Sequence, residues 1–341
     1  MSHADGPARH RAAALDLGPL ASPVRRSMNG EHPGDTGTML PPLVDHHVHL
    51  MIVGAHALAD TALAGVVDLG APLDLLTERR AHDGLPHVEF AGTFLTAPGG
   101  YPIGRPWAVP GCAREVSAAA GDGRGSLPSP AETAVSEQQG FGASVIKVAL
   151  NAAAGPVFDR TTLDAIVAAA HERGMPVVAH VEGDGMTRLA VEAGVDVLAH
   201  TPFTERVDDE LIARATASGQ RWISTLFVTS HGAPGEPSTE RDLALDNLRR
   251  FQAAGGRVLY GTDLGNGDQP LGVNPAEVDL LTMGGLGASD VLAAICDPWP
   301  QAERDDAVAT FVPGPPPTTL DELAGWLATA RLVPAEELEA L

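Results

Sequence analysis

The sequence predicts an α/β fold, namely a (β/α)8 TIM barrel with appendages formed by the chain termini. Eight short apolar runs lie between residues 43 and 262, and most of them alternate with helix-like segments. This alternation predicts parallel strands joined by right-handed crossovers. Five of the runs end in histidine, lysine or aspartate, and a barrel builds its active site at the carboxyl ends of its strands. A Rossmann-type sheet is the alternative, but no G-x-G-x-x-G follows the first run.

Turn and cap residues separate the predicted elements. Gly70 and Pro72 stop the second strand, Ser129 suits the cap of the following helix, and Gly174 and Gly194 end two later helices. The predicted strands are residues 43–48, 65–70, 87–96, 143–150, 175–180, 195–200, 221–228 and 257–262. The predicted helices are residues 55–64, 73–82, 130–139, 160–173, 185–193, 208–218, 239–254, 275–283 and 289–295.

The two ends of the chain lie outside the predicted barrel at residues 41–300. Residues 1–40 are rich in Gly, Pro, Arg, His and Ser, so we expect an N-terminal tail with at most one short strand. Residues 301–341 are predicted to form a C-terminal appendage with a strand at 307–312 and a helix at 320–332.

Composition limits the classes of partner. Hydrophobic residues make up 44% of the chain and support a large core, whereas the net charge of -22 argues against nucleic-acid binding. Cys112 and Cys296 form no CxxC pair and are expected to be unpaired thiols. The N-terminus has no signal-peptide pattern, and no apolar stretch is long enough for a membrane span. We therefore expect a cytoplasmic protein with a small-molecule substrate and with neither nucleic-acid nor membrane partners.

The first strand carries the most informative motif. His47 and His49 alternate along it, so they project from the same face, about 7 Å apart by strand rise. Two imidazoles on one face suit a transition metal, and a polar edge strand with incidental histidines is the alternative. Later strand ends add a second group of candidates: Lys147, His180, His200 and Asp263. Four histidines and one carboxylate exceed the needs of one four-coordinate zinc, which favours two metal ions.

Lys147 is unusual among these candidates, because an ammonium group repels cations. Reaction with carbon dioxide would convert its amine into a carbamate, a bidentate anion able to bridge two ions. A salt bridge in the barrel mouth is the alternative for this lysine.

These motifs together resemble the amidohydrolase superfamily. They occur in that family's order, one per strand end, over about residues 41–297, and they resemble most the branch with two metals bridged by a carboxylated lysine. A further T-A-P-G-G at residues 96–100 is similar to imidazolonepropionase-related amidohydrolases, which include Xaa-Pro dipeptidases. The matching segments are D-x-H-V-H at 45–49, V-I-K-V around Lys147, A-H at 179–180, A-H-T at 199–201 and G-T-D at 261–263.

The resemblance implies different roles for the individual site residues. His47, His49 and Asp263 would hold the more buried metal, and His180 and His200 the more exposed one. The Lys147 carbamate would bridge both ions together with a hydroxide that attacks a carbonyl, and Asp263 would carry the proton to the leaving group. The implied cofactors are two divalent ions, with zinc the first expectation, although manganese, cobalt and iron also accept such ligands.

The resemblance implies a β-sandwich built from both termini, and here the sequence departs from the family: we expect a reduced or vestigial β-sandwich appendage, with residues 1–40 as a remnant of it. Only residues 306–333 resemble the end of the family's sandwich, so a partner subunit in a homo-oligomer could supply the missing buried surface. The expected activity is hydrolysis of an amide-type C–N bond, linear or cyclic. Lactone hydrolysis, deamination and ligand binding without turnover remain alternatives.

Two loops rich in Gly and Pro are candidates for substrate contact. The stretch 97–129 is longer than most connectors within a domain, and loops of this length are usually lids or binding loops. It contains Tyr101 and Arg105, either of which suits a substrate carbonyl or carboxylate. His231 opens the second loop, at 231–237, and is a third weak candidate.

Overall fold

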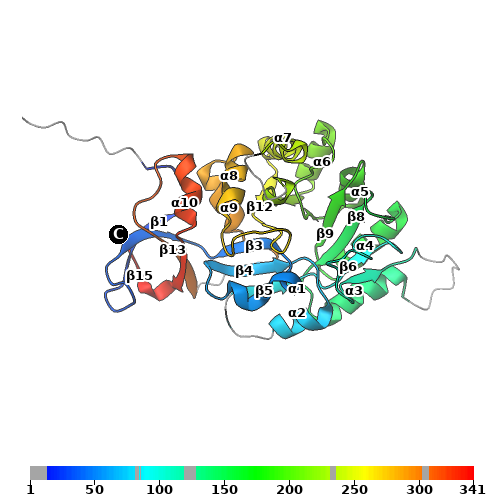
Figure 1. Ribbon diagram of the computed structural model, residues 1–341, viewed down its shortest axis with the longest axis horizontal. Helices are drawn as coiled ribbons and strands as arrows, with labels where there is room; N and C mark the ends of the chain where they lie inside the picture. The colour runs from blue at the N-terminus through cyan, green and yellow to red at the C-terminus, as the bar shows by residue number, and fades with distance from the viewer. Residues whose placement is uncertain (1–13, 81–83, 85, 119–127, 231–235, 302–306) are drawn as a thin grey trace, which may run out of the picture.

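A computed structural model describes residues 14–80, 84, 86–118, 128–230, 236–301 and 307–341. Its parallel strands form two sheets, surrounded by helices, while strands from both termini form a third sheet at one end of the molecule (Figure 1). The mixed α/β class with parallel strands is as the sequence predicts.

The larger parallel sheet has the order β12-β11-β10-β9-β8-β6-β7, and the smaller one the order β3-β4-β5. The strand bounds are β3 Leu43–Val48, β4 Leu63–Asp68, β5 His87–Phe90, β6 Phe94–Thr96, β7 Ala113–Glu115, β8 Ile146–Asn151, β9 Val177–Glu182, β10 Val197–Leu198, β11 Arg221–Ile223 and β12 Arg257–Leu259. β7 arises within the predicted loop 97–129 and pairs with β6.

Backbone hydrogen bonds link the two sheets. The amide of His49 donates to the carbonyl of Leu264 (2.9 Å), which joins the end of β3 to the segment after β12. On the other side, the predicted strand 87–96 is divided into β5 and β6, because Gly92 between them has φ +76°. The amide of Ser144 donates to the carbonyl of Phe90 (3.0 Å) across this break. A complete eightfold barrel remains a prediction, since the strands belong to two separate sheets.

The helices follow the strands with boundaries close to those expected. Ser129 and Glu132 form a capping box at the start of α3, and Gly174 (φ +68°) follows α4. The predicted helix 55–64 is wrong, because only a 3-10 turn forms at Ala55–Leu58 before β4 begins at Leu63. The helices are α1 Leu50–Val53, α2 Leu73–Arg80, α3 Pro130–Gly140, α4 Arg160–His171, α5 Met186–Ala193, α6 Asp209–Ala217, α7 Thr239–Ala253, α8 Pro275–Met283, α9 Ala288–Ile295 and α10 Leu323–Leu327.

The termini build one antiparallel sheet in the order β14-β13-β2-β1-β15. Its strands are β1 Ser22–Arg26, β2 Thr36–Leu40, β13 Val308–Pro313, β14 Arg331–Pro334 and β15 Leu338–Ala340. The expectation of at most one strand before residue 40 is therefore wrong. β1 has no apolar run of its own, and it is stabilised by pairing with β15 and by the ion pair of Arg26 with Glu337.

α10 packs against α8 and connects the terminal sheet to the rest of the core. This helix is shorter than the predicted 320–332, because the chain re-enters the sheet as β14. The division at residues 40 and 300 into separate domains remains a prediction. Within the described residues, no helix combines the length and the apolar character needed to cross a bilayer.

Candidate metal centre

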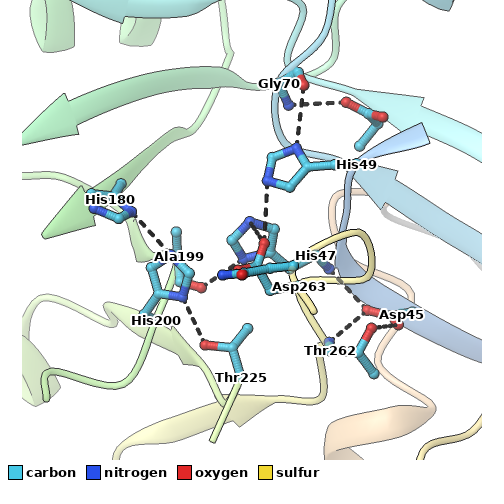
Figure 2. Close-up of polar contacts among 12 residues, drawn as sticks. Asp45, His47, His49, Gly70, His180, Ala199, His200, Thr225, Thr262 and Asp263 are labelled. Carbon is cyan, nitrogen blue, oxygen red and sulfur yellow. Dashed lines mark hydrogen bonds and ion pairs between the residues drawn. The ribbon is translucent and has the colours of Figure 1, made fainter. Parts of the chain in front are cut away.

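All six predicted ligands line one cavity of about 380 Å³. We call this cavity, with all of its lining residues, the central cavity. His47 and His49 lie at the end of β3, Lys147 on β8, His180 on β9, His200 just after β10, and Asp263 after β12. Figure 2 shows that the four imidazoles and the Asp263 carboxylate converge from these separate elements. The predicted convergence of strand-end residues is thus present in the structure.

The outer nitrogens of two imidazoles are fixed by backbone carbonyls (Figure 2). His47 donates from Nδ1 to the carbonyl of Ala199 (2.8 Å), and His49 donates from Nδ1 to that of Gly70 (3.2 Å). With these protons on Nδ1, both Nε2 atoms present lone pairs to the cavity. Each lies 3.2 Å from Oδ1 of Asp263, which is also an acceptor. His47 Nε2 is buried without a hydrogen-bond partner.

Burial sets the charge state of this group. Burial is the main cause that lowers the pKa of His47 well below its ordinary value, which favours the neutral, metal-binding imidazole. Burial alone would raise the pKa of Asp263, but attraction to the protonated forms of the His47, His49 and His200 imidazoles lowers it well below its usual range. Two imidazole nitrogens, those of His47 and His49, therefore face one oxygen of the Asp263 carboxylate.

Asp263 occupies an unusual backbone conformation, with φ +56°. Asp45 stabilises the preceding turn, because its carboxylate accepts hydrogen bonds from the amide (3.0 Å) and hydroxyl (2.6 Å) of Thr262. The same carboxylate accepts from the amide of His47 (3.1 Å), so it connects the two strand ends that carry ligands. Asn266 completes the turn by donating to Oδ2 of Asp263 (3.0 Å).

The second pair of imidazoles is arranged in the same way. His180 donates from Nε2 to Glu182 (3.2 Å), and Nδ1 of His200 lies 2.9 Å from the hydroxyl of Thr225. The facing atoms, Nδ1 of His180 and Nε2 of His200, are 3.0 Å apart. If both outer nitrogens carry the protons, two lone pairs meet here, and a cation between them would relieve their repulsion.

Lys147 is 1% exposed, and its Nζ lies 5.7 Å from the centroid of the Phe94 ring. Burial lowers the pKa of Lys147 to about 7, against the opposing effects of Asp263 and Asp68. A substantial fraction is then the neutral amine near neutral pH, which is the form that reacts with carbon dioxide. Lys147 is also the only lysine in the 341-residue sequence. Apart from the histidines, all the other basic residues are arginines.

The candidates for substrate contact differ in where they lie relative to the central cavity. The ring of Tyr101 stacks on His180, with centroids 4.9 Å apart, and lines the central cavity. Arg105 is exposed and lies beside the Tyr101 ring, but it is not part of the cavity lining. His231 lies outside the described residues. His46, predicted to point away from the ligands, contacts the carbonyls of Tyr260 and Asp297.

Several cavity residues were missed by sequence reasoning. Glu182 follows His180 by two positions on β9, so the alternation that identified His47 and His49 would also have found it. The presence of only one lysine, Lys147, in the whole sequence is a second feature that marks this site. The other missed lining residues lie on loops, on helix ends or within a strand, with no motif to mark them: Ile52, Phe94, Trp107, Phe203, Val228, Thr229, Glu240, Gly265 and Asn266.

Comparison with known proteins adds evidence on the fold. No family model matches the chain. Uncharacterized protein Rv2915c of Mycobacterium tuberculosis is 28% identical over 293 residues, which cover 77% of this chain and 73% of that protein. Uncharacterized protein Mb2939c of Mycobacterium bovis matches to the same extent.

Solved structures of hydrolases share the architecture. A Xaa-Pro dipeptidase with bound methionine has a TM-score of 0.64 at 19% identity, covering 89% of this chain and 87% of its own. A protein named as an amidohydrolase gives 0.64 at 21% identity, with coverages of 89% and 86%. A prolidase complexed with N-methylphosphonate-L-proline gives 0.63 at 20% identity, with coverages of 89% and 86%. The chain therefore has an amidohydrolase-type fold, which confirms at the level of fold the resemblance seen in its motifs.

Proposed function

We propose that this protein is a metal-dependent hydrolase that cleaves an amide-type C–N bond, linear or cyclic. The observation that carries the proposal is the set of facing acceptor atoms in the central cavity. His47 Nε2 is buried without a hydrogen-bond partner and faces Oδ1 of Asp263 at 3.2 Å. Buried acceptors without donors are costly unless a cation binds them.

The donor set suits two divalent ions. His47, His49 and Asp263 would hold one ion, and His180 and His200 the other, with the carbamate of Lys147 between them. Nitrogen and carboxylate donors of this kind fit zinc first and also manganese, cobalt or iron. Bound there, such ions would lower the pKa of a bound water to about 7 and polarise a carbonyl.

The protein's own residues supply the remaining steps. Asp263 is ionised and lies beside the imidazoles, so it can accept a proton and return it to the departing nitrogen. Tyr101, Trp107 and Phe94 lie within 6.5 Å of one another by ring centroid and form an apolar wall that limits the access of water. The dipeptidase and prolidase names of two solved structures support an amide substrate.

The direct test is to reconstitute the protein with Zn²⁺ and bicarbonate and to assay it against dipeptides, anilides, lactones and amino-purines. We expect metal-dependent cleavage of amides. Turnover of lactones alone would favour the lactonase alternative, and release of ammonia from amino-purines would favour a deaminase. Metal binding without any turnover would favour a ligand-binding barrel. A cytoplasmic location and a homo-oligomeric state belong to the same proposal.

Thr225 provides a test of how the ligands are oriented. This buried β-branched residue has φ +41°, and its hydroxyl meets Nδ1 of His200 at 2.9 Å. Thr225→Val removes the hydroxyl at nearly constant shape, so we expect metal affinity to fall by about 10- to 100-fold. Thr225→Ser keeps the hydroxyl and should retain most of the affinity. Calorimetric zinc titration would measure both variants, and equal affinity for the two would show that the hydroxyl does not orient His200.

A further inference from the structure

The first turn of α8 carries a buried carboxylate that none of the proposed chemical steps uses. Glu277 is 0% exposed and is not part of the lining of the central cavity. A carboxylate buried away from water is costly unless hydrogen-bond donors or a positive charge stabilise its ionised form. The donors that surround Glu277 therefore indicate what this side chain does in the fold.

Glu277 binds the backbone of the segment that follows β11. Its Oε1 accepts a hydrogen bond from the amide of Leu226 (2.9 Å), and its Oε2 accepts one from the amide of Phe227 (2.7 Å). The hydroxyl of Ser224 also favours the ionised carboxylate, whereas burial is the larger effect and raises the pKa of Glu277 to about 7. One side chain of α8 thus holds residues 224–227 in place.

This segment contains the contact with His200. Thr225 is 0% exposed and has φ +41°, a backbone conformation that a β-branched residue rarely adopts. Its hydroxyl lies 2.9 Å from Nδ1 of His200. Such a conformation persists only where surrounding contacts fix it. The amides of Leu226 and Phe227 follow Thr225 directly, so their hydrogen bonds to Glu277 are among the contacts that fix it.

We propose that Glu277 is a positioning residue, which orients His200 for metal binding by holding the Thr225 turn in place. Glu277 acts on the backbone after Thr225, and the Thr225 hydroxyl acts on Nδ1 of His200. Glu277 itself contacts neither metal nor substrate, because it lies outside the cavity lining. This inference rests on the proposed hydrolase function, since it concerns the orientation of one proposed ligand of that site.

A double-mutant cycle on zinc affinity tests the proposal. Zinc would be titrated at pH 8, above the pKa of Glu277, into the unaltered protein, Glu277→Gln, Thr225→Val and the double variant. Glutamine keeps one acceptor oxygen but turns an NH2 group toward the second backbone amide. We therefore expect the affinity for the ion held by His180 and His200 to fall by about tenfold. In the Thr225→Val background, the same substitution should cause less than about a threefold further loss.

Two controls separate this role from general support of the fold. Asp279→Asn, at an exposed position on the same helix, should leave zinc affinity unchanged. In the metal-free protein, Glu277→Gln should speed hydrogen exchange at the amides of Leu226 and Phe227 by about tenfold or more, while amides within α8 keep their rates.

The outcomes are distinct. Unchanged zinc affinity in Glu277→Gln, or an equal loss with and without the Thr225 hydroxyl, would overturn the inference. If Glu277→Gln does not fold, Glu277→Asp, which keeps a carboxylate on a shorter side chain, takes its place in the same cycle. Failure of the unaltered protein to bind zinc would instead contradict the proposed function.

Discussion

Replacement of Lys147 by alanine is expected to remove both the metal and the activity. Lys147 is the only lysine of the chain, is 1% exposed and lines the central cavity with the other proposed ligands. Its carbamate would supply two oxygens and one negative charge between two ions. Loss of a hydrogen-bond partner of a metal ligand typically lowers metal affinity by about 10- to 100-fold. We expect a larger fall for Lys147→Ala, because a ligand itself is lost. Zinc content after dialysis and amide hydrolysis would measure the two losses.

Three further experiments distinguish the carbamate from a cation. Lys147→Arg should remain inactive, because arginine stays charged and would repel both ions. A short carboxylic acid added to Lys147→Ala should restore part of the metal binding by occupying the gap. Because the chain has one lysine, a carbamate signal in ¹³C NMR after addition of labelled bicarbonate need be distinguished only from the N-terminal amine. Normal metal binding and turnover by Lys147→Arg would show that the residue forms a salt bridge instead.

Substitution of Asp263 by asparagine is expected to lower kcat by about 10²- to 10⁴-fold, the usual contribution of a positioned acid–base group. Its carboxylate lies 3.2 Å from Nε2 of both His47 and His49, and these neighbours keep it ionised. Asparagine keeps the shape and one acceptor oxygen but cannot accept a proton. Since Asp263 is also a proposed ligand, kcat should be measured at saturating zinc.

Asp268→Asn is the matched control for Asp263→Asn. Asp268 is exposed in the same turn and does not line the central cavity, so its substitution should leave kcat unchanged. If Asp263→Asn keeps normal kcat at saturating zinc while Asp268→Asn also behaves normally, Asp263 is not the proton carrier.

Local sequence patterns predicted the elements that carry the site. β3 spans Leu43–Val48 as expected, because its apolar run is long enough to indicate a strand and its alternation places His47 and His49 on one face. Lys147 was located because a charged residue in a β-branched run is conspicuous. The facing of His180 and His200 follows from their positions at the ends of neighbouring parallel strands.

The remaining features depend on contacts between distant segments. β1 and β2 have no strong pattern, and they form because β15 and β13 from the other end of the chain pair with them. The strand expected at 195–200 is regular only at Val197–Leu198, since the residues after it turn into the cavity. Trp107 and Phe203 reach the cavity through loop conformations that no local periodicity encodes.

The most direct test of the binuclear centre is elemental analysis of the zinc-reconstituted protein. After saturation with Zn²⁺ and bicarbonate and removal of free metal, the account predicts two zinc ions per chain, with the ratio falling in Lys147→Ala. A reproducible ratio near one in the unaltered protein under the same conditions would contradict it.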